Sequence, residues 1–340
     1  MANERRGGRR EGKRPSRRQA ERGVEALLAH AQSPQTDLLA ETEAEIAARE
    51  ASTPKFTGDL TNLDTLRGLL RRHGLRPNKS FGQHLLVDRG ALDTILAAAE
   101  LSPDDNVLEV GAGTGVLTVE LARRVRRVVA VELDRAILPV LRETTARYPQ
   151  VEIIPRDLLD VQPATVFGEE PYKLVANLPY YITALTLRHF LEASNPPRLL
   201  VVMVQWEVAQ RLTARPGDLS LLGLSVQFYG QPRLVAKVPA ASFYPPPQVD
   251  SAIVRVDLYD RPPLEDAEQR ERFFALAHAG FAEKRKQLHN SLARNLRVPQ
   301  QTVAQWLTAA EIDPMRRAET LSLDEWLRLA RIAREEQLPS

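Results

Sequence analysis

The stretch Asn106-Val107-Leu108-Glu109-Val110-Gly111-Ala112-Gly113-Thr114-Gly115 decides the fold of this chain. It begins with a short apolar run of the length of a buried strand, and glycines then stand at alternate positions. Glycine allows a sharp turn and a close approach of backbone to ligand at the carboxyl edge of a parallel sheet. Position 116 is valine, so the G-x-G-x-G spacing departs from the G-x-G-x-x-G of dinucleotide-binding proteins. We predict a strand at 106–110, a ligand-binding turn and a helix at 115–124.

The residues after this turn alternate between apolar runs and amphipathic stretches. The runs predict strands at 106–110, 128–132, 151–154, 172–177 and 199–204, followed by strands at 221–229, 233–238 and 251–258 that proline-rich turns connect. The amphipathic stretches predict helices at 115–124, 135–148, 183–192 and 207–214. The predicted fold class is therefore α/β: a Rossmann-like, mostly parallel sheet with helices on both faces and antiparallel last strands.

Three regions follow from changes in composition. Residues 58–260 form the α/β domain, which opens with helices at about 63–73 and 88–100. Residues 261–340 begin with a boundary segment that contains Pro262-Pro263 and then show only helical periodicity, so a small all-α C-terminal domain of about four short helices is expected. Residues 1–57 are a basic extension that we expect to be disordered, with possible short helices at 22–32 and 36–52.

The charge of the chain is unevenly distributed. The net charge is +2, yet residues 1–18 carry eight Arg or Lys against two Glu, so the rest of the chain is net negative. A polyanion must therefore be bound by local basic patches or by the tail. The tail is either an RNA-binding arm or a solubilising segment, and a mitochondrial transit peptide is a weaker alternative.

Cysteine is absent, which excludes disulfides, thiolate zinc sites and a cysteine nucleophile. No apolar run approaches the roughly 18 residues of a membrane span. We expect a soluble protein of the cytoplasm that makes no use of a membrane.

Polar groups follow the first three predicted parallel strands. Gly111 follows the first strand, Glu132 ends the second and Asp157 follows the third. A carboxylate at position 132 would face a ribose diol, and one at position 157 would accept a hydrogen bond from the amine of an adenine. Either acid alone is as readily an ordinary surface residue. Together the three predict a site for an adenosine-containing ligand without a pyrophosphate.

The tetrapeptide Asn177-Leu178-Pro179-Tyr180 ends the fourth strand. The amide oxygen of Asn177 can accept a hydrogen bond from an exocyclic amine, Pro179 stiffens the turn, and the ring of Tyr180 can stack on a purine. On its own, such a tetrapeptide is more often the end of a strand followed by a proline turn. Beside the adenosine site, it predicts a pocket for a flipped adenine.

An ordered set of motifs resembles the ribosomal RNA adenine dimethyltransferases, and most of all their bacterial small-subunit members. The set comprises 79–86 (KSFGQHLL), 107–115, 131–134 (VELD), Asp157, 177–181 (NLPYY), 204–208 (VQWEV) and 243–251 (FYPPPQVDS). The resemblance spans about 79–296. It departs at Trp206 and Gln248, where relatives often carry lysine.

The resemblance implies a class I methyltransferase that uses S-adenosyl-L-methionine. It places the donor on His84, Leu86, Gly111, Gly113, Glu132, Asp157 and Asn177. The catalytic pocket would comprise Asn177, Leu178, Pro179 and Tyr180, with Phe243 against the second face of the base, although Phe243 also reads as a core aromatic. RNA contacts in the C-terminal domain would come from Lys284, Arg285, Lys286, Arg294 and Arg297, along one side of a helix with His289. Arg71, Arg72, Arg76 and Lys79 form a second basic cluster.

The implied reaction is dimethylation of the N6 amine of two adjacent adenosines in the 3′-terminal hairpin loop of small-subunit (16S) rRNA. The substrate would be immature ribosomal particles, and the enzyme a monomer that needs no metal. Two alternatives remain open at this point: the large-subunit methyltransferase of the macrolide-resistance type, and a non-catalytic protein resembling mitochondrial transcription factors.

Overall fold

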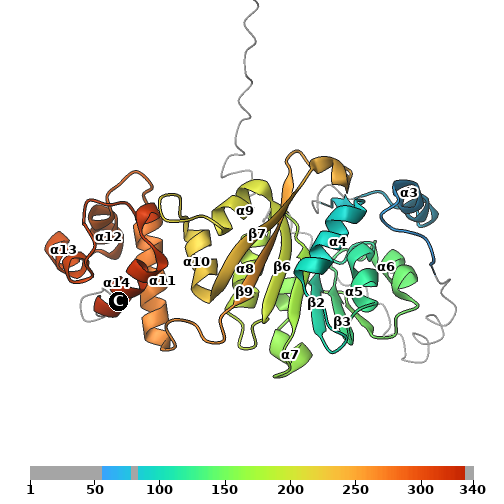
Figure 1. The fold of residues 1–340 in the computed structure, drawn as a ribbon, viewed down its shortest axis with the longest axis horizontal. Coiled ribbons are helices and arrows are strands. Elements are labelled where there is room, and N and C mark those ends of the chain that lie inside the picture. Colours follow the sequence, from blue (N-terminus) through green and yellow to red (C-terminus); the bar gives the residue numbers. More distant parts are fainter. Residues whose placement is uncertain (1–55, 78–82, 334–340) are drawn as a thin grey trace, which may run out of the picture. The chain divides into compact units, whose positions relative to one another are not determined.

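The computed structural model describes residues 56–77 and 83–333 of the chain. Its centre is a seven-stranded sheet with the order β4-β3-β2-β5-β6-β9-β7 (Figure 1). The strands are β2 (Asn106–Val110), β3 (Arg127–Val131), β4 (Val151–Ile154), β5 (Lys173–Asn177), β6 (Leu199–Gln205), β7 (Gly230–Val238) and β9 (Ser251–Leu258). The five strands from β4 to β6 are parallel, and β9 is antiparallel to both of its neighbours. The predicted fold class is confirmed, with the reversal confined to β9.

The strand β2 is buried along its whole length because it is covered on both sides of the sheet. Alternate side chains on a strand point to opposite faces. Leu108 and Val110 pack into one hydrophobic cluster, and Val107 packs into the other. This two-sided burial explains why the sequence of β2 is apolar except for Asn106 and Glu109.

Two helical layers cover the sheet. One layer contains α4 (Arg89–Ala98), α5 (Val116–Ala122) and α6 (Leu138–Thr145). The other contains α7 (Pro163–Phe167), α8 (Thr183–Leu191), α9 (Trp206–Leu212) and α10 (Leu221–Tyr229). The connections after β2, β3, β4 and β5 each lead into a helix, so the loops of the parallel strands open at the same edge of the sheet.

A second, two-stranded sheet lies outside the predicted pattern. Its strands, β1 (Leu85–Leu86) and β8 (Phe243–Tyr244), pair in antiparallel fashion. Each strand is only two residues long, too short for a periodic pattern to reveal. The pairing joins the segment before α4 to the proline-rich turn before β9. It therefore brings His84 and Pro245, the neighbours of these strands, to the same place.

The predicted strand at 221–229 is wrong, because these residues form the helix α10. The Ser220 side chain caps the helix by accepting a hydrogen bond from the Gly223 backbone N–H at 3.1 Å. Val226 packs toward the sheet, whereas Leu224 and Phe228 pack against the C-terminal helices. A helix buried on two sides shows no polar face, so its sequence resembles that of a buried strand.

The C-terminal region is helical, as predicted. Its helices are α11 (Ala267–Phe281), α12 (Leu288–Leu296), α13 (Gln300–Ala309) and α14 (Leu323–Ile332). They enclose a hydrophobic cluster that contains Phe273 and Trp326 and also Leu224 and Phe228 of α10. The proposed division at residue 260 therefore leaves part of this cluster on the N-terminal side, and it stays a prediction.

The helix α3 (Leu63–Arg72) precedes β1, and Asn62 caps it by accepting two backbone N–H bonds at 3.0 Å. Within 56–77 and 83–333, no helix is both long and apolar enough to span a bilayer. The predictions for residues 1–55 and for Lys79 lie outside the described residues.

Candidate active site

The polar residues predicted from the strand ends meet at one edge of the sheet. The strands β4, β3, β2 and β5 are consecutive neighbours in the sheet and run in the same direction. Asp157, Glu132, Gly111 and Asn177 stand at or just beyond their carboxyl ends. Sequence reasoning therefore selected four neighbouring positions that the fold brings together.

Glu132 connects the glycine turn to the loop after β3, because each of its carboxylate oxygens accepts one backbone N–H bond. Oε2 accepts a hydrogen bond from the Gly113 backbone N–H at 2.7 Å, and Oε1 accepts one from the Asp134 N–H at 2.8 Å. The residue is 8% exposed. Burial raises the pKa of its carboxyl, and the two backbone donors partly offset this effect. Glu132 is thus a fixed part of the site, and its contact with a ribose stays a prediction.

The glycine turn fits closely against the tetrapeptide loop. Gly111 has a φ of +72°, and a Cβ there would lie 3.6 Å from the Pro179 Cδ and 3.7 Å from the Asn177 carbonyl oxygen. The turn and the loop are therefore in near contact. A side chain at position 111 would occupy space between two neighbouring strand ends, where a ligand is expected to lie.

Asp157 begins a short 3₁₀ turn, Leu158–Asp160. Its Oδ1 accepts a hydrogen bond from the Leu159 N–H at 3.0 Å. Burial raises the pKa of the Tyr181 phenol, and the negative charges of Asp157 and Glu132 add to this effect. Asp157 is therefore oriented at the edge of the sheet, and its contact with an adenine amine stays a prediction.

The side chain of Asn177 has a defined orientation. Its Nδ2 donates a hydrogen bond to the backbone carbonyl oxygen of His84 at 3.2 Å. A carbonyl oxygen can only accept, so the amide nitrogen must face it. The amide oxygen is left to accept a hydrogen bond from a ligand.

The backbone of Leu178 is tied to the neighbouring strand. Its N–H donates to the carbonyl oxygen of Met203 at 3.1 Å, and its side chain is 1% exposed. The buried side chain anchors the loop by packing into the hydrophobic cluster on one face of the sheet. Leu178 can therefore contribute to a ligand only through its carbonyl oxygen.

Tyr180 is held at both ends of its side chain. Its hydroxyl shares a hydrogen bond with Ser251 Oγ at 2.7 Å, and its ring stacks with the His84 ring at a centroid distance of 5.8 Å. The His84 Nδ1 in turn bonds to the Pro245 carbonyl oxygen at 2.8 Å. Burial raises the pKa of Tyr180, so its hydroxyl stays protonated near neutral pH. A neutral, immobilised ring is suited to stacking.

Phe243 and Leu86 lie deeper than the other predicted residues. They are 3% and 2% exposed, and both belong to the hydrophobic cluster beneath the sheet. They are also register partners in the β1–β8 pair. In this conformation Phe243 packs as a core aromatic, and its stacking on a base stays a prediction. Leu86 can reach a donor only through its backbone.

Glu109 was not selected from the sequence as a site residue. It is wholly buried two positions before Gly111, and its Oε2 has no hydrogen-bond partner among the described residues. Burial raises the pKa of its carboxyl to about 8, and the nearby charge of Glu132 adds to the shift. The feature of the sequence that could have indicated Glu109 is a single acidic residue within an otherwise mostly apolar strand.

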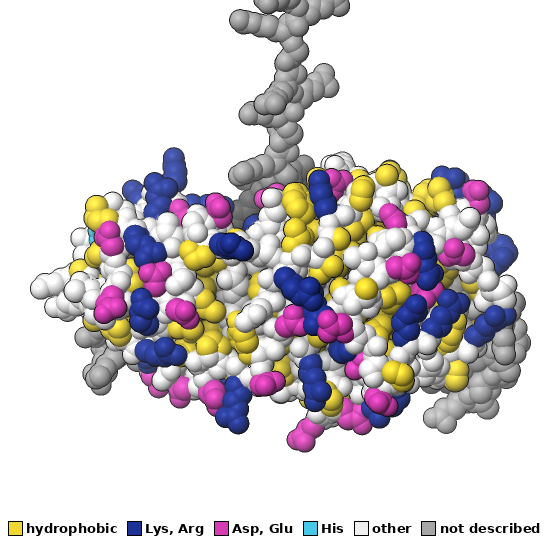
Figure 2. Space-filling view, in the orientation of Figure 1, with side chains coloured by type: hydrophobic (Ala, Val, Ile, Leu, Met, Phe, Trp, Pro, Cys, Tyr) yellow, Lys and Arg dark blue, Asp and Glu magenta, His cyan; other side chains and the backbone are white. Residues whose placement is uncertain are grey.

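The basic residues of the C-terminal region do not lie along one helix, contrary to the prediction. Lys284, Arg285 and Lys286 are exposed in the turn between α11 and α12. Arg294 lies on α12 and pairs with Glu283 at 3.0 Å, and Arg297 ends that helix with a positive φ. In Figure 2, Lys and Arg are interspersed with Asp and Glu on the face shown. RNA contact by these residues stays a prediction.

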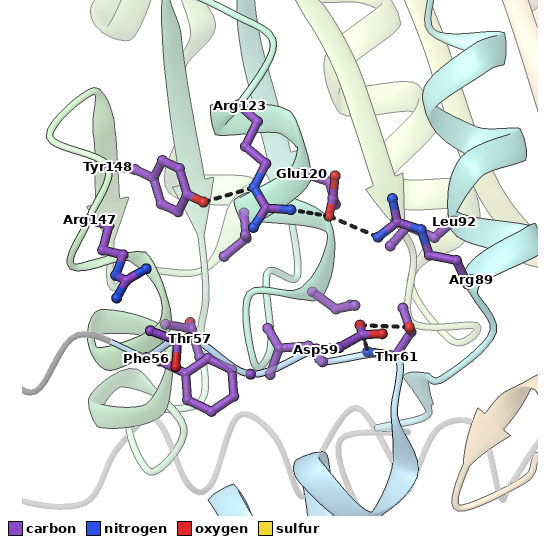
Figure 3. Close-up of a pocket in the computed structure, with 15 residues that line it drawn as sticks. Phe56, Thr57, Asp59, Thr61, Arg89, Leu92, Glu120, Arg123, Arg147 and Tyr148 are labelled. Carbon is purple, nitrogen blue, oxygen red and sulfur yellow. Dashed lines mark hydrogen bonds and ion pairs between the residues drawn. The ribbon is translucent and has the colours of Figure 1, made fainter.

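A cavity of about 200 Å³ lies apart from the predicted site residues, against α4, α5 and α6 (Figure 3). Arg89 and Arg123 both bond to Glu120 at its wall, at 3.0 and 2.7 Å. Asp59 and Arg147 also line it. None of the residues predicted for donor or base belongs to this lining.

The fold and the site together define a class of protein. A mostly parallel sheet with one reversed strand, a G-x-G-x-G turn and an acid at the end of the next strand are typical of class I S-adenosyl-L-methionine-dependent methyltransferases. The absence of a side chain at Gly111 and the carboxylate at Glu132 fit such a donor.

Comparison with known proteins identifies the family. The family model described as ribosomal RNA adenine dimethylase matches residues 74–335. The chain belongs to this family. A curated relative from Dehalococcoides mccartyi, strain 195, "Ribosomal RNA small subunit methyltransferase A", is 49% identical over 82% of this chain and 96% of its own length. A relative of the same name from Pelotomaculum thermopropionicum is 45% identical over 78% and 94%.

Solved structures agree. The crystal structure of the 23S rRNA methyltransferase ErmE is 32% identical, with a TM-score of 0.60, and the match covers 72% of this chain and 98% of that one. A dimethyladenosine transferase from Plasmodium falciparum is 26% identical, also at 0.60, over 72% and 96%. The chain is thus an S-adenosyl-L-methionine-dependent rRNA adenine dimethyltransferase, and the non-catalytic alternative is not favoured.

Proposed function

We propose that this enzyme dimethylates the N6 amine of two adjacent adenosines in the 3′-terminal hairpin loop of small-subunit (16S) rRNA. The observation that carries the proposal is the fixed pair Asn177 and Tyr180, held by His84 and Ser251 beside the glycine turn. The choice of the small subunit is supported by the names of the curated relatives, which are 45% and 49% identical. The ErmE structure, at 32% identity, supports the large-subunit alternative less strongly.

The acceptor is a weak nucleophile, because the lone pair of an adenine amine is delocalised into the ring. The amide oxygen of Asn177 and the carbonyl oxygen of Leu178 accept its two N–H bonds and favour a tetrahedral nitrogen. The ring of Tyr180 stacks on the base and fixes its plane. Because His84 and Ser251 hold these groups before the base arrives, little reorganisation remains at the moment of transfer.

The donor, when bound, would supply a methyl group on a sulfonium: the N–C bond forms in line with the C–S bond that breaks, and a neutral thioether leaves, which requires no metal. On this chain Gly111 and Gly113 leave room for its backbone-facing side, Glu132 accepts from its ribose, and Asp157 accepts from its adenine amine. The attacking nitrogen becomes acidic only as the new bond forms, so no strong base is required among these residues.

We infer immature small-subunit particles as the substrate, because a hairpin base can be extruded most readily before the RNA is fully packed. A ribosomal RNA substrate implies action in the cytoplasm. We expect a monomer, with Lys284, Arg285, Lys286, Arg294 and Arg297 contacting phosphates. None of these exposed side chains is required by the core.

The test is methyl transfer from tritiated donor to isolated small- and large-subunit particles, followed by mapping of the labelled nucleotides. We expect label on two adjacent adenosines of the small-subunit hairpin in immature particles. Label confined to large-subunit rRNA would favour the alternative, and absence of label from both would contradict the proposal.

A further inference from the structure

An aromatic side chain and a cation form a pair at the rim of the pocket. The Lys237 Nζ lies 5.2 Å from the centroid of the Trp206 ring. The same ammonium pairs with Asp250 Oδ2 at 2.8 Å, and its side chain is 51% exposed. The Lys237 ammonium lowers the pKa of Asp250, so the carboxylate stays charged and holds the ammonium over the indole.

The pair is adjacent to the acceptor pocket. Trp206 directly follows Gln205, and the register partner of Gln205 across the sheet is Ser251. Ser251 Oγ bonds to the Tyr180 hydroxyl at 2.7 Å. The Trp206 backbone N–H also donates to the Asp250 carbonyl oxygen at 3.0 Å. Gln205 therefore lies between Trp206, its neighbour in the chain, and Ser251, its partner across the sheet, which bonds to Tyr180.

The exposure of Trp206 differs from that of the other tryptophans. Trp306 and Trp326 are 4% and 0% exposed within the C-terminal cluster, whereas Trp206 is only partly buried. Val249, next to Asp250, is 45% exposed. An apolar surface with a cation beside a nucleic-acid pocket has the composition of a base-stacking site.

We propose that Trp206 and Lys237 bind the unpaired nucleotide next to the target adenosine, with its phosphate on the ammonium and its base against the exposed part of the indole that the ammonium leaves open. This inference rests on the proposed function. A base that leaves its stack to enter the pocket deprives its neighbour of a stacking partner, and the indole replaces that partner. The ammonium has three donors, so it can keep Asp250 while it contacts a phosphate.

Tryptophan fluorescence provides a direct readout, because two of the three tryptophans are buried. We expect a hairpin RNA carrying the two adenosines to quench the full-length protein. In the Trp206→Phe variant this quenching should disappear, while the KM for the hairpin should rise less than in Trp206→Ala because the phenyl ring keeps part of the stacking surface. Quenching that persists in Trp206→Phe would overturn the inference.

Kinetics separate a stacking role from a structural one. Trp206→Ala should raise KM for the hairpin about 10-fold, with kcat changed little, since one base stack is lost. A hairpin with an abasic residue beside the target should raise KM for the wild type similarly and leave the variant unaffected. An equal effect of the abasic residue on both proteins would contradict stacking. Donor affinity and thermal unfolding report whether Trp206→Ala is folded, and Trp206→Phe covers the case in which it is not.

The charge of Lys237 has a matched control on the same strand. Arg233 is also exposed on β7 and pairs with Asp257 at 3.6 Å, but its register partner lies in the middle of β9. Lys237→Ala should reduce the salt dependence of RNA binding by about one ion, and Arg233→Ala should not. Equal slopes for both variants would contradict the phosphate contact. If the wild type methylates no rRNA adenosine, the proposed function fails instead.

Discussion

The side-chain amide of Asn177 donates a hydrogen bond to the backbone carbonyl oxygen of His84 across 3.2 Å, although 93 positions separate the two residues in the chain. The bond connects the end of β5 with the start of β1. It determines which end of the amide faces the acceptor pocket. It also links Asn177 to His84, whose ring stacks on that of Tyr180.

Asn177→Asp tests whether this orientation is needed. A carboxylate can accept from an adenine amine, but it cannot donate to the His84 carbonyl oxygen and would face it oxygen to oxygen. We expect kcat for methyl transfer to fall at least about 100-fold, as for other losses of a preorganised polar group. Single-turnover methyl transfer at saturating donor measures this. Activity near that of the wild type would show that the bond to His84 is dispensable.

Gly115→Ala should destabilise the protein, because the new side chain would both strain the backbone and collide with a neighbouring residue. Gly115 has a φ of +84°, and a Cβ there would lie 2.6 Å from Thr144 Oγ1. We expect a loss of about 1–3 kcal/mol in the free energy of unfolding, measured by urea denaturation.

Gly74→Ala is the matched control, because Gly74 also has a positive φ, of +65°, but no atom within 4 Å of its would-be Cβ. It should cost only the backbone strain, about 1 kcal/mol. If both variants lose the same stability, the contact with Thr144 contributes nothing.

Glu109 predicts a dependence of stability on pH. Its pKa rises from the usual 4.5 to about 8 in the folded chain, so the folded state binds more protons than the unfolded state between these values. Stability therefore falls as pH rises through this window, by up to about 1.4 kcal/mol per pH unit. Glu109→Gln cannot lose a proton and should remove this part of the slope. Urea unfolding from pH 5 to pH 8 measures it.

Glu207 provides a comparison, because it is exposed on α9. Glu207→Gln should leave the slope as it is in the wild type. A stability difference between Glu109→Gln and wild type that stays constant with pH would contradict the raised pKa.

The exposed turn between α11 and α12 should contribute to RNA affinity. Replacing Lys284, Arg285 and Lys286 by alanine should weaken binding uniformly across RNA sequences. The salt slope should decrease by about 3, or one ion for each phosphate contact. Filter binding of the hairpin at several salt concentrations measures both quantities.

A variant with the same charge change tests the location of the contact. Arg126 and Arg188 are exposed and Arg127 is partly exposed, and each of the three pairs with a carboxylate, at 2.5, 3.0 and 2.6 Å. Their triple replacement by alanine should change the salt slope less than that of the turn. The reverse order would place the RNA elsewhere.

Much of the fold was predictable, because two-sided burial makes parallel strands continuous apolar runs. The same reasoning failed at α10, where burial on two sides removes the polar face of a helix. It also missed β1 and β8, whose two-residue lengths leave no period. Local sequence patterns therefore predict a helix or strand only where its two faces differ in polarity, or where the segment is long enough for its type to be recognised.

The candidate site was predictable where its residues follow strands. Gly111, Glu132, Asp157 and Asn177 could be placed together because neighbouring parallel strands end at one edge. The partners His84 and Ser251 could not be found in this way. Their contacts with Asn177 and Tyr180 depend on packing between segments that are distant in the sequence.

The central claim is that Asn177 to Tyr180 present an adenine amine of small-subunit rRNA to the donor. The most direct measurement is nucleoside mass analysis of immature small-subunit particles treated with donor and either the wild type or Asn177→Ala. The wild type should yield two N6,N6-dimethyladenosines per particle at adjacent positions of the 3′-terminal hairpin, and Asn177→Ala should yield none. Equal dimethylation by both proteins, or by neither, would contradict the claim.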